Sequence, residues 1–210
     1  GFQKPRRISH TQSKDQKTKN MKITRVDQFA PRNRTRLIRI TTDSGIEGWA
    51  ESTLEGKPQS VPAAIDEFAG YLIGKDPLRI EHHWQGMYRS SFFRGGAHNM
   101  SAIAAIDAAL WDIAGKHFNV PTHALMGGKV REKARVYYHV FGDTTETLIA
   151  GIVDARAQGF TAVGHLTPFL DEPRDRPYFK THVGMIRGAI DTVGAYREAV
   201  GDDVDLCIEI

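Results

Sequence analysis

The chain has 210 residues, of which 40% are hydrophobic and 25% are charged, and its formal net charge is only +3. This balance is typical of an ordinary globular protein, and no apolar run approaches the ~20 residues that a membrane-spanning helix needs. The single cysteine, Cys207, excludes a disulfide framework and favours a reducing, cytoplasmic location.

The first 20 residues differ in composition from everything that follows. Up to Lys22 the chain has one acidic residue, Asp15, against seven basic ones: Lys4, Arg6, Arg7, Lys14, Lys17, Lys19 and Lys22. A polar, like-charged segment of this kind predicts disorder over residues 1–20, and we interpret it as tag or upstream sequence, with a genuine basic arm as the alternative. Few aromatic residues accompany the basic run and no basic stripe follows it. We therefore expect neither a nucleic acid nor a membrane as a partner.

Three strands are expected next. Residues 22–29 alternate loosely between apolar and polar side chains, and residues 35–42 and 46–52 form clearer strand patterns. Between the last two, Thr42-Asp43-Ser44-Gly45 has the composition of a tight turn. Consecutive strands with short connections predict an antiparallel meander.

Helices follow the strands. Ser60 is the expected N-cap of a helix with Pro62 in its first turn, and this helix should run to about Ile73, where Gly74 stops it. A second helix is expected over about residues 79–88. Strands followed by helices indicate an α+β domain.

The stretch from Ala102 to Gly127 is the most distinctive in the chain. It predicts a long amphipathic helix, a turn at residues 119–121 and a short helix that ends at the Gly127–Gly128 pair. The apolar face follows three- and four-residue spacing and consists of Ile103, Ile106, Leu110 and Ile113. Asp107 and Asp112 lie off that face.

From residue 132 the pattern becomes strand, helix, strand, helix, strand. The expected strands are residues 134–141, 160–166 and 204–210, and the helices are residues 145–158, capped at Thr144 or Thr145, and residues 182–200. Apolar strands separated by helices predict parallel βα units. Both the start of a (β/α)₈ barrel and a doubly wound sheet fit this order.

The long helix also carries a specific resemblance. Its order of residue types is A-x-A-A-I-D-x-A-L-W-D-I-x-G-K, followed after four residues by P-x-x-x-L-M-G. This resembles the signature helix of the mandelate racemase and muconate lactonizing group of the enolase superfamily, with one departure at Thr122. The segments GWAESTLEGK, YLIGKDP, MYRSSFFRGG and ALMGGKVR look like the galactonate dehydratase-like sugar-acid dehydratases of that group.

The resemblance implies an architecture. An α+β N-terminal capping domain, residues 21–131, is followed by the first strands and helices of a (β/α)₈ TIM-type barrel, residues 132–210. A complete barrel typically needs ~250 residues. The resemblance therefore predicts an incomplete barrel and a C-terminally truncated chain.

The resemblance also implies a metal. Enolase-superfamily enzymes use Mg²⁺, held by carboxylates at the ends of successive barrel strands, and the residue that matches the first ligand is Glu209. The alternative is a strand-end glutamate in solvent. The further carboxylates would come from later strands, so we expect this chain alone to lack activity.

The end of the second barrel strand lacks the lysine that many members use as a base. Gly164 and His165 occupy that region, which counts against a lysine-based mechanism and favours the sugar-acid dehydratases. We expect His165 to be a catalytic residue that touches substrate, and a structural histidine is the alternative.

In the capping domain, Lys57, Arg94 and His98 lie in two expected loops, residues 51–57 and 89–98, and would bind the hydroxyls and carboxylate of a sugar acid. Loops of this size are also often merely polar.

The expected reaction is loss of water from a galactonate-like aldonate to give a 2-keto-3-deoxy acid. Two alternatives stay open: a non-catalytic, partner-binding fragment, and a racemase or epimerase of the same superfamily. The full-length form is expected to be a homo-oligomer.

Overall fold

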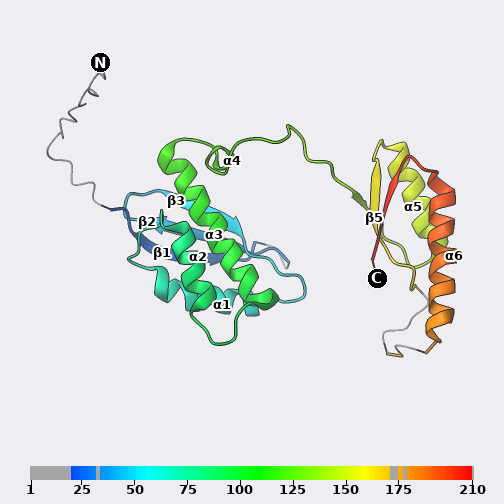
Figure 1. Ribbon diagram of the computed structural model, residues 1–210, viewed down its shortest axis with the longest axis horizontal. Coiled ribbons are helices and arrows are strands. Elements are labelled where there is room, and N and C mark those ends of the chain that lie inside the picture. Colours follow the sequence, from blue (N-terminus) through cyan, green and yellow to red (C-terminus); the bar gives the residue numbers. More distant parts are fainter. Residues whose placement is uncertain (1–19, 32–33, 171–174, 177–178, 210) are drawn as a thin grey trace, which may run out of the picture. The chain divides into compact units, whose positions relative to one another are not determined.

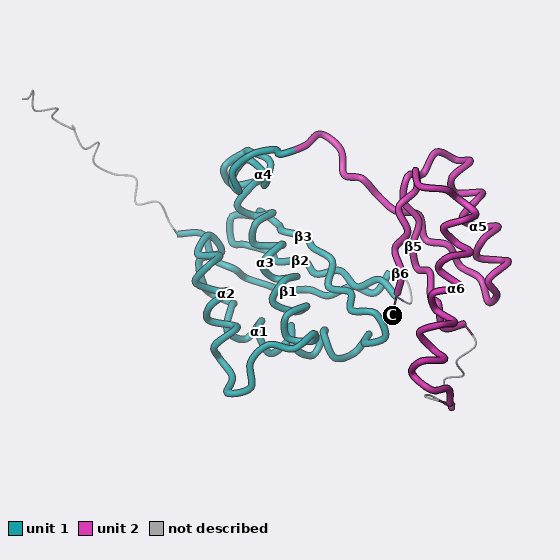
Figure 2. Tube along the Cα trace, turned by 45° about the vertical axis from the view of Figure 1, so that its right-hand side comes forward, with its two compact units in different colours: residues 1–130 teal, residues 131–210 magenta. Residues whose placement is uncertain are grey.

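A computed structural model describes residues 20–31, 34–170, 175–176 and 179–209. The chain divides into two compact units, the first ending at Val130 and the second beginning at Arg131 (Figure 2). Of the segment expected to be disordered, residues 1–20, all but Asn20 lies outside the described residues.

The first unit begins with a three-stranded antiparallel sheet in the order β1-β2-β3. The strands are β1 (Ile23–Phe29), β2 (Leu37–Thr42) and β3 (Glu47–Glu51), so the expected meander is confirmed with slightly shorter strands. Gly45 takes a φ of 82° in the turn between β2 and β3, where its N–H donates to the carbonyl of Thr42 at 3.1 Å. A left-handed conformation of this kind suits glycine because it has no Cβ.

The two faces of this sheet differ in chemistry. Ile38 and Ile40 are fully buried on the face toward the helices. On the other face the Arg39 guanidinium lies over the rings of Phe29 and Trp49, at 5.3 and 5.4 Å from their centroids, and pairs with Asp27 at 2.8 Å. Trp49 remains 41% exposed beneath that arginine.

Four helices complete the unit: α1 (Ser60–Leu72), α2 (Ile80–Arg89), α3 (Gly96–Phe118) and α4 (Thr122–Leu125) (Figure 1). The expected N-cap at Ser60 is wrong. The cap position is Gln59, which makes no side-chain cap bond, and Ser60 is the first helical residue, with a buried hydroxyl that has no hydrogen-bond partner. Helix α3 begins at Gly96, earlier than expected, so it includes His98.

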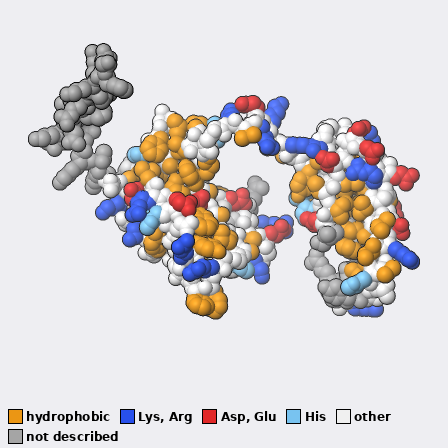
Figure 3. Space-filling view, in the orientation of Figure 1, with side chains coloured by type: hydrophobic (Ala, Val, Ile, Leu, Met, Phe, Trp, Pro, Cys, Tyr) orange, Lys and Arg blue, Asp and Glu red, His pale blue; other side chains and the backbone are white. Residues whose placement is uncertain are grey.

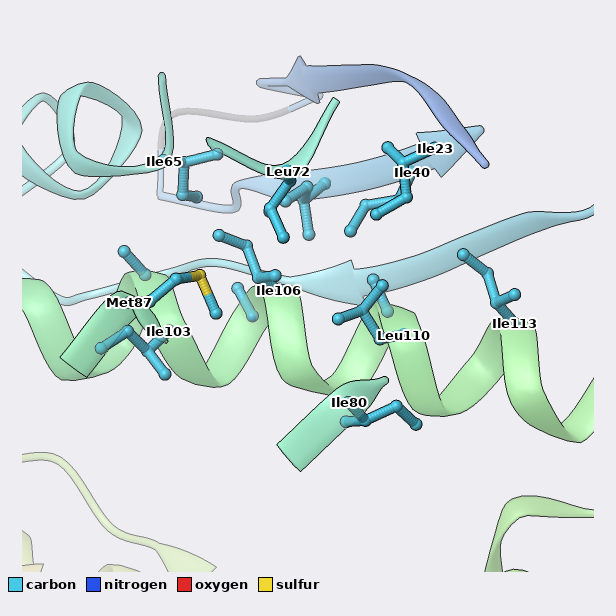
Figure 4. Close-up of a cluster of buried hydrophobic side chains, with 14 of the residues drawn as sticks. Ile23, Ile40, Ile65, Leu72, Ile80, Met87, Ile103, Ile106, Leu110 and Ile113 are labelled. Atoms are coloured by element: carbon cyan, nitrogen blue, oxygen red, sulfur yellow. The ribbon is translucent and has the colours of Figure 1, made fainter. Parts of the chain in front are cut away.

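The core of the first unit lies between α3 and the sheet (Figure 4). The expected apolar face of α3 is confirmed, since Ile103, Ile106, Leu110 and Ile113 are all 1% exposed or less. Gly48 of β3 sits against this helix so closely that a Cβ would overlap the carbonyl oxygen of Ala109.

Asp112, which lies off the apolar face of α3, ties the helix to the edge of the sheet. Its Oδ2 accepts from the N–H of Trp49 at 2.9 Å and from Lys116 Nζ at 2.7 Å. Lys116 Nζ also donates to the carbonyl of Glu47 at 2.7 Å. A polar position outside the core thus satisfies backbone groups of β3 that pair with no strand.

The second unit is a three-stranded parallel sheet in the order β4-β5-β6, with helices after β4 and β5. Its elements are β4 (Tyr138–His139), α5 (Thr145–Ala157), β5 (Ala162–Leu166), α6 (His182–Val200) and β6 (Asp205–Ile208). The parallel βα arrangement is confirmed. Thr144 is the N-cap of α5, accepting from the N–H of Thr147.

Strand β4 is much shorter than the expected residues 134–141. Among the described strands it pairs with β5 alone. The segment before β4 forms no strand pairing there, and the Arg135 side chain holds it to the neighbouring strands. Arg135 Nε donates to Thr161 Oγ1 at 3.0 Å, and its guanidinium also pairs with Asp205.

Both helices of this unit lie on one side of the strands (Figure 1). The core is formed on that side by Val140, Leu148, Ile152, Ala155, Val163, Leu166, Tyr196, Val200 and Val204. Cys207 lies within β6 and is exposed. Within the described ranges, no helix combines the length and apolar character that crossing a membrane requires.

Candidate active site at the strand ends

The carboxyl ends of β4, β5 and β6 meet at one edge of the parallel sheet. In β4 and its extension the side chains alternate: Val140 is 3% exposed and packs toward the helices, while His139 and Phe141 lie to either side of it in sequence and are exposed. Successive side chains of a strand point to opposite faces. The open face of the sheet therefore collects the rings of His139 and Phe141, whereas Tyr138 lies on the same side as Val140 and packs against Phe160.

A β-bulge in β5 adds a second group to this face. Val163 pairs with Leu206 and Leu166 pairs with Ile208, so the two residues Gly164 and His165 together oppose Cys207. Both Val163 and Leu166 remain fully buried on the helix side. The extra residue turns His165 out of the strand pattern, which is how bulges often aim a side chain beside an active site.

His165 reaches the residue that follows β6. Its Nδ1 lies 2.8 Å from Glu209 Oε2, and the Glu209 N–H donates to the carbonyl of Leu166 at 2.8 Å. The side chains are 37% and 57% exposed, respectively. His165 takes a φ of 64°, in the left-handed region that non-glycine residues rarely adopt. Backbone strain of this kind clusters at functional sites.

Two aromatic rings, one in β4 and one in the segment that follows it, contact the His165 imidazole. The His139 ring meets it at 4.5 Å between centroids and 70° between planes, and the Phe141 ring stacks at 5.9 Å and 30°. Tyr137 stacks in turn on His139 at 4.8 Å. None of these three side chains was among the site residues predicted from the sequence. The available signal was the alternation Tyr137-x-His139-x-Phe141 about a buried Val140.

The donor chemistry of this edge fits one ligand of a hard cation. Glu209 offers carboxylate oxygens, which Mg²⁺ prefers, and only one of them is engaged by His165. Among the residues that the structure describes, however, no group of three His, Cys, Asp or Glu side chains could hold a metal ion. One carboxylate is fewer ligands than a tight site needs.

The remaining predicted site residues lie in the first unit. Lys57 and Arg94 are exposed, on the segments after β3 and before α3, as expected. The expected loop position of His98 is wrong, because α3 already begins at Gly96 and His98 belongs to its first turn, where it is exposed. The structure thus brings His165 and Glu209 together, while the three expected substrate contacts belong to another unit.

A sequence comparison identifies the first unit. The sequence model of the mandelate racemase / muconate lactonizing enzyme N-terminal domain matches residues 11–127. Proteins named D-galactonate dehydratase are 42% identical in Xanthomonas oryzae pv. oryzae and 50% identical in Xanthomonas axonopodis pv. citri, each over 189 residues that cover 90% of this chain. The chain spans about half the length of the curated relatives it matches, 48% in both cases.

Solved structures agree on the fold. A member of the enolase superfamily from Salmonella Typhimurium superimposes with a TM-score of 0.76 at 30% identity, over 90% of this chain and 55% of that one. An enolase from Pantoea ananatis, solved with bound D-gluconate and Mg, superimposes with a TM-score of 0.74 at 27% identity, over 90% and 53% of the two chains. The parallel unit of this chain therefore corresponds to the first strands and helices of a (β/α) barrel.

Proposed function

The chain belongs to the mandelate racemase / muconate lactonizing enzyme family, and from this premise we propose that it forms part of a Mg²⁺-dependent sugar-acid dehydratase that acts on a galactonate-like aldonate. In this proposal residues 21–131 are the capping domain and residues 132–210 belong to the barrel. The observation that carries it is the contact between His165 and Glu209 at the carboxyl edge of parallel strands. That edge is where the active sites of (β/α)₈ enzymes are built.

The proposed reaction removes the proton from C2 of a 2,3-dihydroxy acid and the hydroxyl group from C3. The two leave as water, and the resulting enol becomes a 2-keto-3-deoxy acid. Magnesium, when bound, would hold the substrate carboxylate and stabilise the negative charge that develops beside it. Glu209 would be one ligand of the ion. His165 would face the substrate beside Glu209, and Lys57, Arg94 and His98 would bind its hydroxyls and carboxylate.

Gly164 favours a dehydratase over a racemase with a lysine base in this strand. A Cβ at this position would lie 2.5 Å from the Tyr137 ring and 2.9 Å from Cys207 Cβ. A lysine there would require both the Tyr137 ring and the Cβ of Cys207 to move. A racemase or epimerase with its bases elsewhere, and a non-catalytic fragment, are outcomes that the experiment below separates.

The test uses protein expressed from its complete gene and a panel of aldonates that includes D-galactonate and D-gluconate. The expected result is a 2-keto acid product with Mg²⁺ and none with EDTA. Glu209→Gln should lose this activity, because the amide is a weaker ligand for a hard cation. Glu198→Gln is the matched control, since it removes the same charge from an exposed position on α6.

Equal product from the wild type and Glu209→Gln would overturn the proposal. Interconverted epimers in place of a keto acid would establish the racemase alternative, and no product from any aldonate would favour the non-catalytic one. The 210-residue chain by itself, with one candidate acidic ligand at the strand ends, is expected to give no turnover. We also propose that the full-length protein is a homo-oligomer. We propose a cytoplasmic location as well, which the free thiol of Cys207 fits.

A further inference from the structure

We propose that His139 is a positioning residue, whose ring holds the His165 imidazole so that Nδ1 points at Glu209. Only the functional role of this contact rests on the proposed function, because the orientation of the Glu209 carboxylate matters most if Glu209 binds a cation. The geometry that carries it lies entirely within the second unit.

The contact between His165 and Glu209 fixes a tautomer. An ionised carboxylate can only accept hydrogen bonds, so the 2.8 Å contact between Nδ1 and Glu209 Oε2 requires the proton on Nδ1. A carboxylate that binds a metal is in turn held by a hydrogen bond from an outer residue, and the Nδ1–H of His165 can provide that bond to Glu209. His165 can perform this role only if its ring cannot rotate away.

The backbone at His165 does not supply that restraint. Its φ of 64° lies in a sparsely populated region, and such a conformation persists only where surrounding contacts determine it. The side chain is 37% exposed, so burial does not hold the ring in place either. The restraint must come from the groups that touch the ring.

Those groups are the rings of His139, in β4, and of Phe141, just beyond the end of the strand. His139 meets the imidazole edge-on at 4.5 Å, and Phe141 stacks on it at 5.9 Å, so the ring is contacted in two different geometries. Edge-to-face and offset-stacked arrangements are the preferred geometries of aromatic pairs. His139 makes the closer contact.

The position of His139 is itself well fixed. Its backbone pairs with Gly164, and the next N–H, that of Val140, donates to the Gly164 carbonyl at 3.0 Å. Tyr137 stacks on the His139 ring at 4.8 Å, with 26° between the ring planes. The short strand β4 therefore places the His139 ring beside the bulge of β5.

The test follows the ring nitrogens of His165 by ¹⁵N NMR in the labelled chain at pH 8. The chain has 9 histidines, and the His165 signals are assigned by their loss in His165→Gln. The wild type should show one fixed tautomer with the proton on Nδ1. In His139→Ala the two nitrogen shifts should move toward each other, as the ring exchanges between tautomers. His139→Phe keeps a ring without nitrogens and should restore the wild-type pattern.

Three outcomes decide the matter. An unchanged tautomer in a folded His139→Ala variant overturns the proposal, and so does a His139→Phe variant that behaves like His139→Ala. Recovery by Phe supports it. Circular dichroism of each variant shows whether the second unit has folded, and if His139→Ala does not fold, the comparison is made with His139→Leu. Because the readout needs neither metal nor turnover, failure of the proposed dehydratase leaves this test intact.

Discussion

His83 in the first unit and His165 in the second are both held by neighbouring residues, but in opposite surroundings. His83 is 1% exposed, and both ring nitrogens are engaged: Nε2 with the carbonyl of Asp76 at 2.8 Å and Nδ1 with the Tyr71 hydroxyl at 3.1 Å. His165 is half-exposed, has a strained backbone and uses one nitrogen. A satisfied, buried histidine serves the fold, whereas a strained and accessible one is a candidate for chemistry.

The glycines make the same contrast between the units. Gly48 faces a backbone oxygen of α3, while Gly164 faces the Tyr137 ring and the Cβ of Cys207. In the first unit the missing side chain of Gly48 lets a helix pack directly on a strand. In the second unit the missing side chain of Gly164 lets the Tyr137 ring lie close to β5, on the side of the sheet away from the helices.

The largest expected effect comes from a substitution at the contact between Gly48 and α3. Gly48→Ala should destabilise the first unit by about 3 kcal/mol, because the new methyl group overlaps a carbonyl that the helix cannot move. Gly164→Ala should cost only about 1 kcal/mol, since the Tyr137 ring can rotate aside. Urea denaturation measures both, and equal losses would contradict the distinction.

The next effect concerns His83 and pH. Burial lowers the pKa of His83 in the folded state, with smaller lowering contributions from His82 and Arg79, while the hydrogen bond to the Asp76 carbonyl and the Asp76 charge raise it. The unfolded chain therefore takes up the proton more readily. The stability that His83 contributes is complete above its ordinary pKa of about 6.5 and is lost as the pH falls below that value.

His83→Ala should lose about 2 kcal/mol at pH 8, because the Tyr71 hydroxyl loses its partner and the Asp76 carbonyl loses the shorter of its two hydrogen bonds, keeping the one from the N–H of Arg79. The variant should also lose this part of the pH dependence of stability. The measurement is the difference in unfolding free energy between wild type and variant from pH 8 to pH 5. Taking the difference matters because burial and the neighbouring Glu81 raise the pKa of Asp107, which acts with the opposite sign. A difference that is constant over this range would contradict the prediction.

A smaller effect tests the strain at the bulge. Both His165→Gly and His165→Ala remove the contact with Glu209, but only glycine adopts a φ of 64° without a steric penalty. The glycine variant should therefore be more stable than the alanine variant by about 1 kcal/mol. Thermal unfolding followed by circular dichroism compares them directly, and a more stable alanine variant would show that the bulge is not strained.

The smallest effect concerns the two helix starts. Thr144→Ala should cost about 1 kcal/mol, because Thr144 caps α5. Ser60→Ala should cost nothing, because its buried hydroxyl has no partner in the described structure. If the serine variant lost as much as the threonine variant, Ser60 would have a role that its position does not explain.

The regular elements could be predicted because their signals are local. Spacing in the stretch from Ala102 identified the α3 core face, and the residue range of α6 was predicted without error. The start of α3 was misplaced because Gly95 and Gly96 have the composition of a loop, and because the buried residues of the helix begin only at Ala102, so that no apolar pattern marks its first turn.

The site was only partly predictable, for a different reason. Glu209 and His165 were found through a family resemblance and the position of strand ends, and they remain candidate site residues. The bulge that brings them together depends on the register between β5 and β6, which is a tertiary property. His139 was missed because its role depends on the neighbouring strand β5, and the alternation around Val140 indicates only which side of the strand His139 lies on.

Exposed apolar side chains are present on both units, as the space-filling view shows for one face (Figure 3). They include Phe92, Phe93, Ile186 and Ile190. Variants should therefore be compared at low protein concentration, so that association does not mask the differences in stability.

The Trp49 ring that lies beneath Arg39 has a practical value. Like the other two tryptophans, Trp84 and Trp111, it precedes residue 130, so every indole of the chain lies in the first unit. Tryptophan emission, excited at a wavelength where tyrosine does not absorb, therefore reports on that unit, whereas tyrosines occur in both units. A melting step visible in the peptide absorption bands but silent in indole emission would belong to residues 131–210, which gives each half its own optical signature without any label.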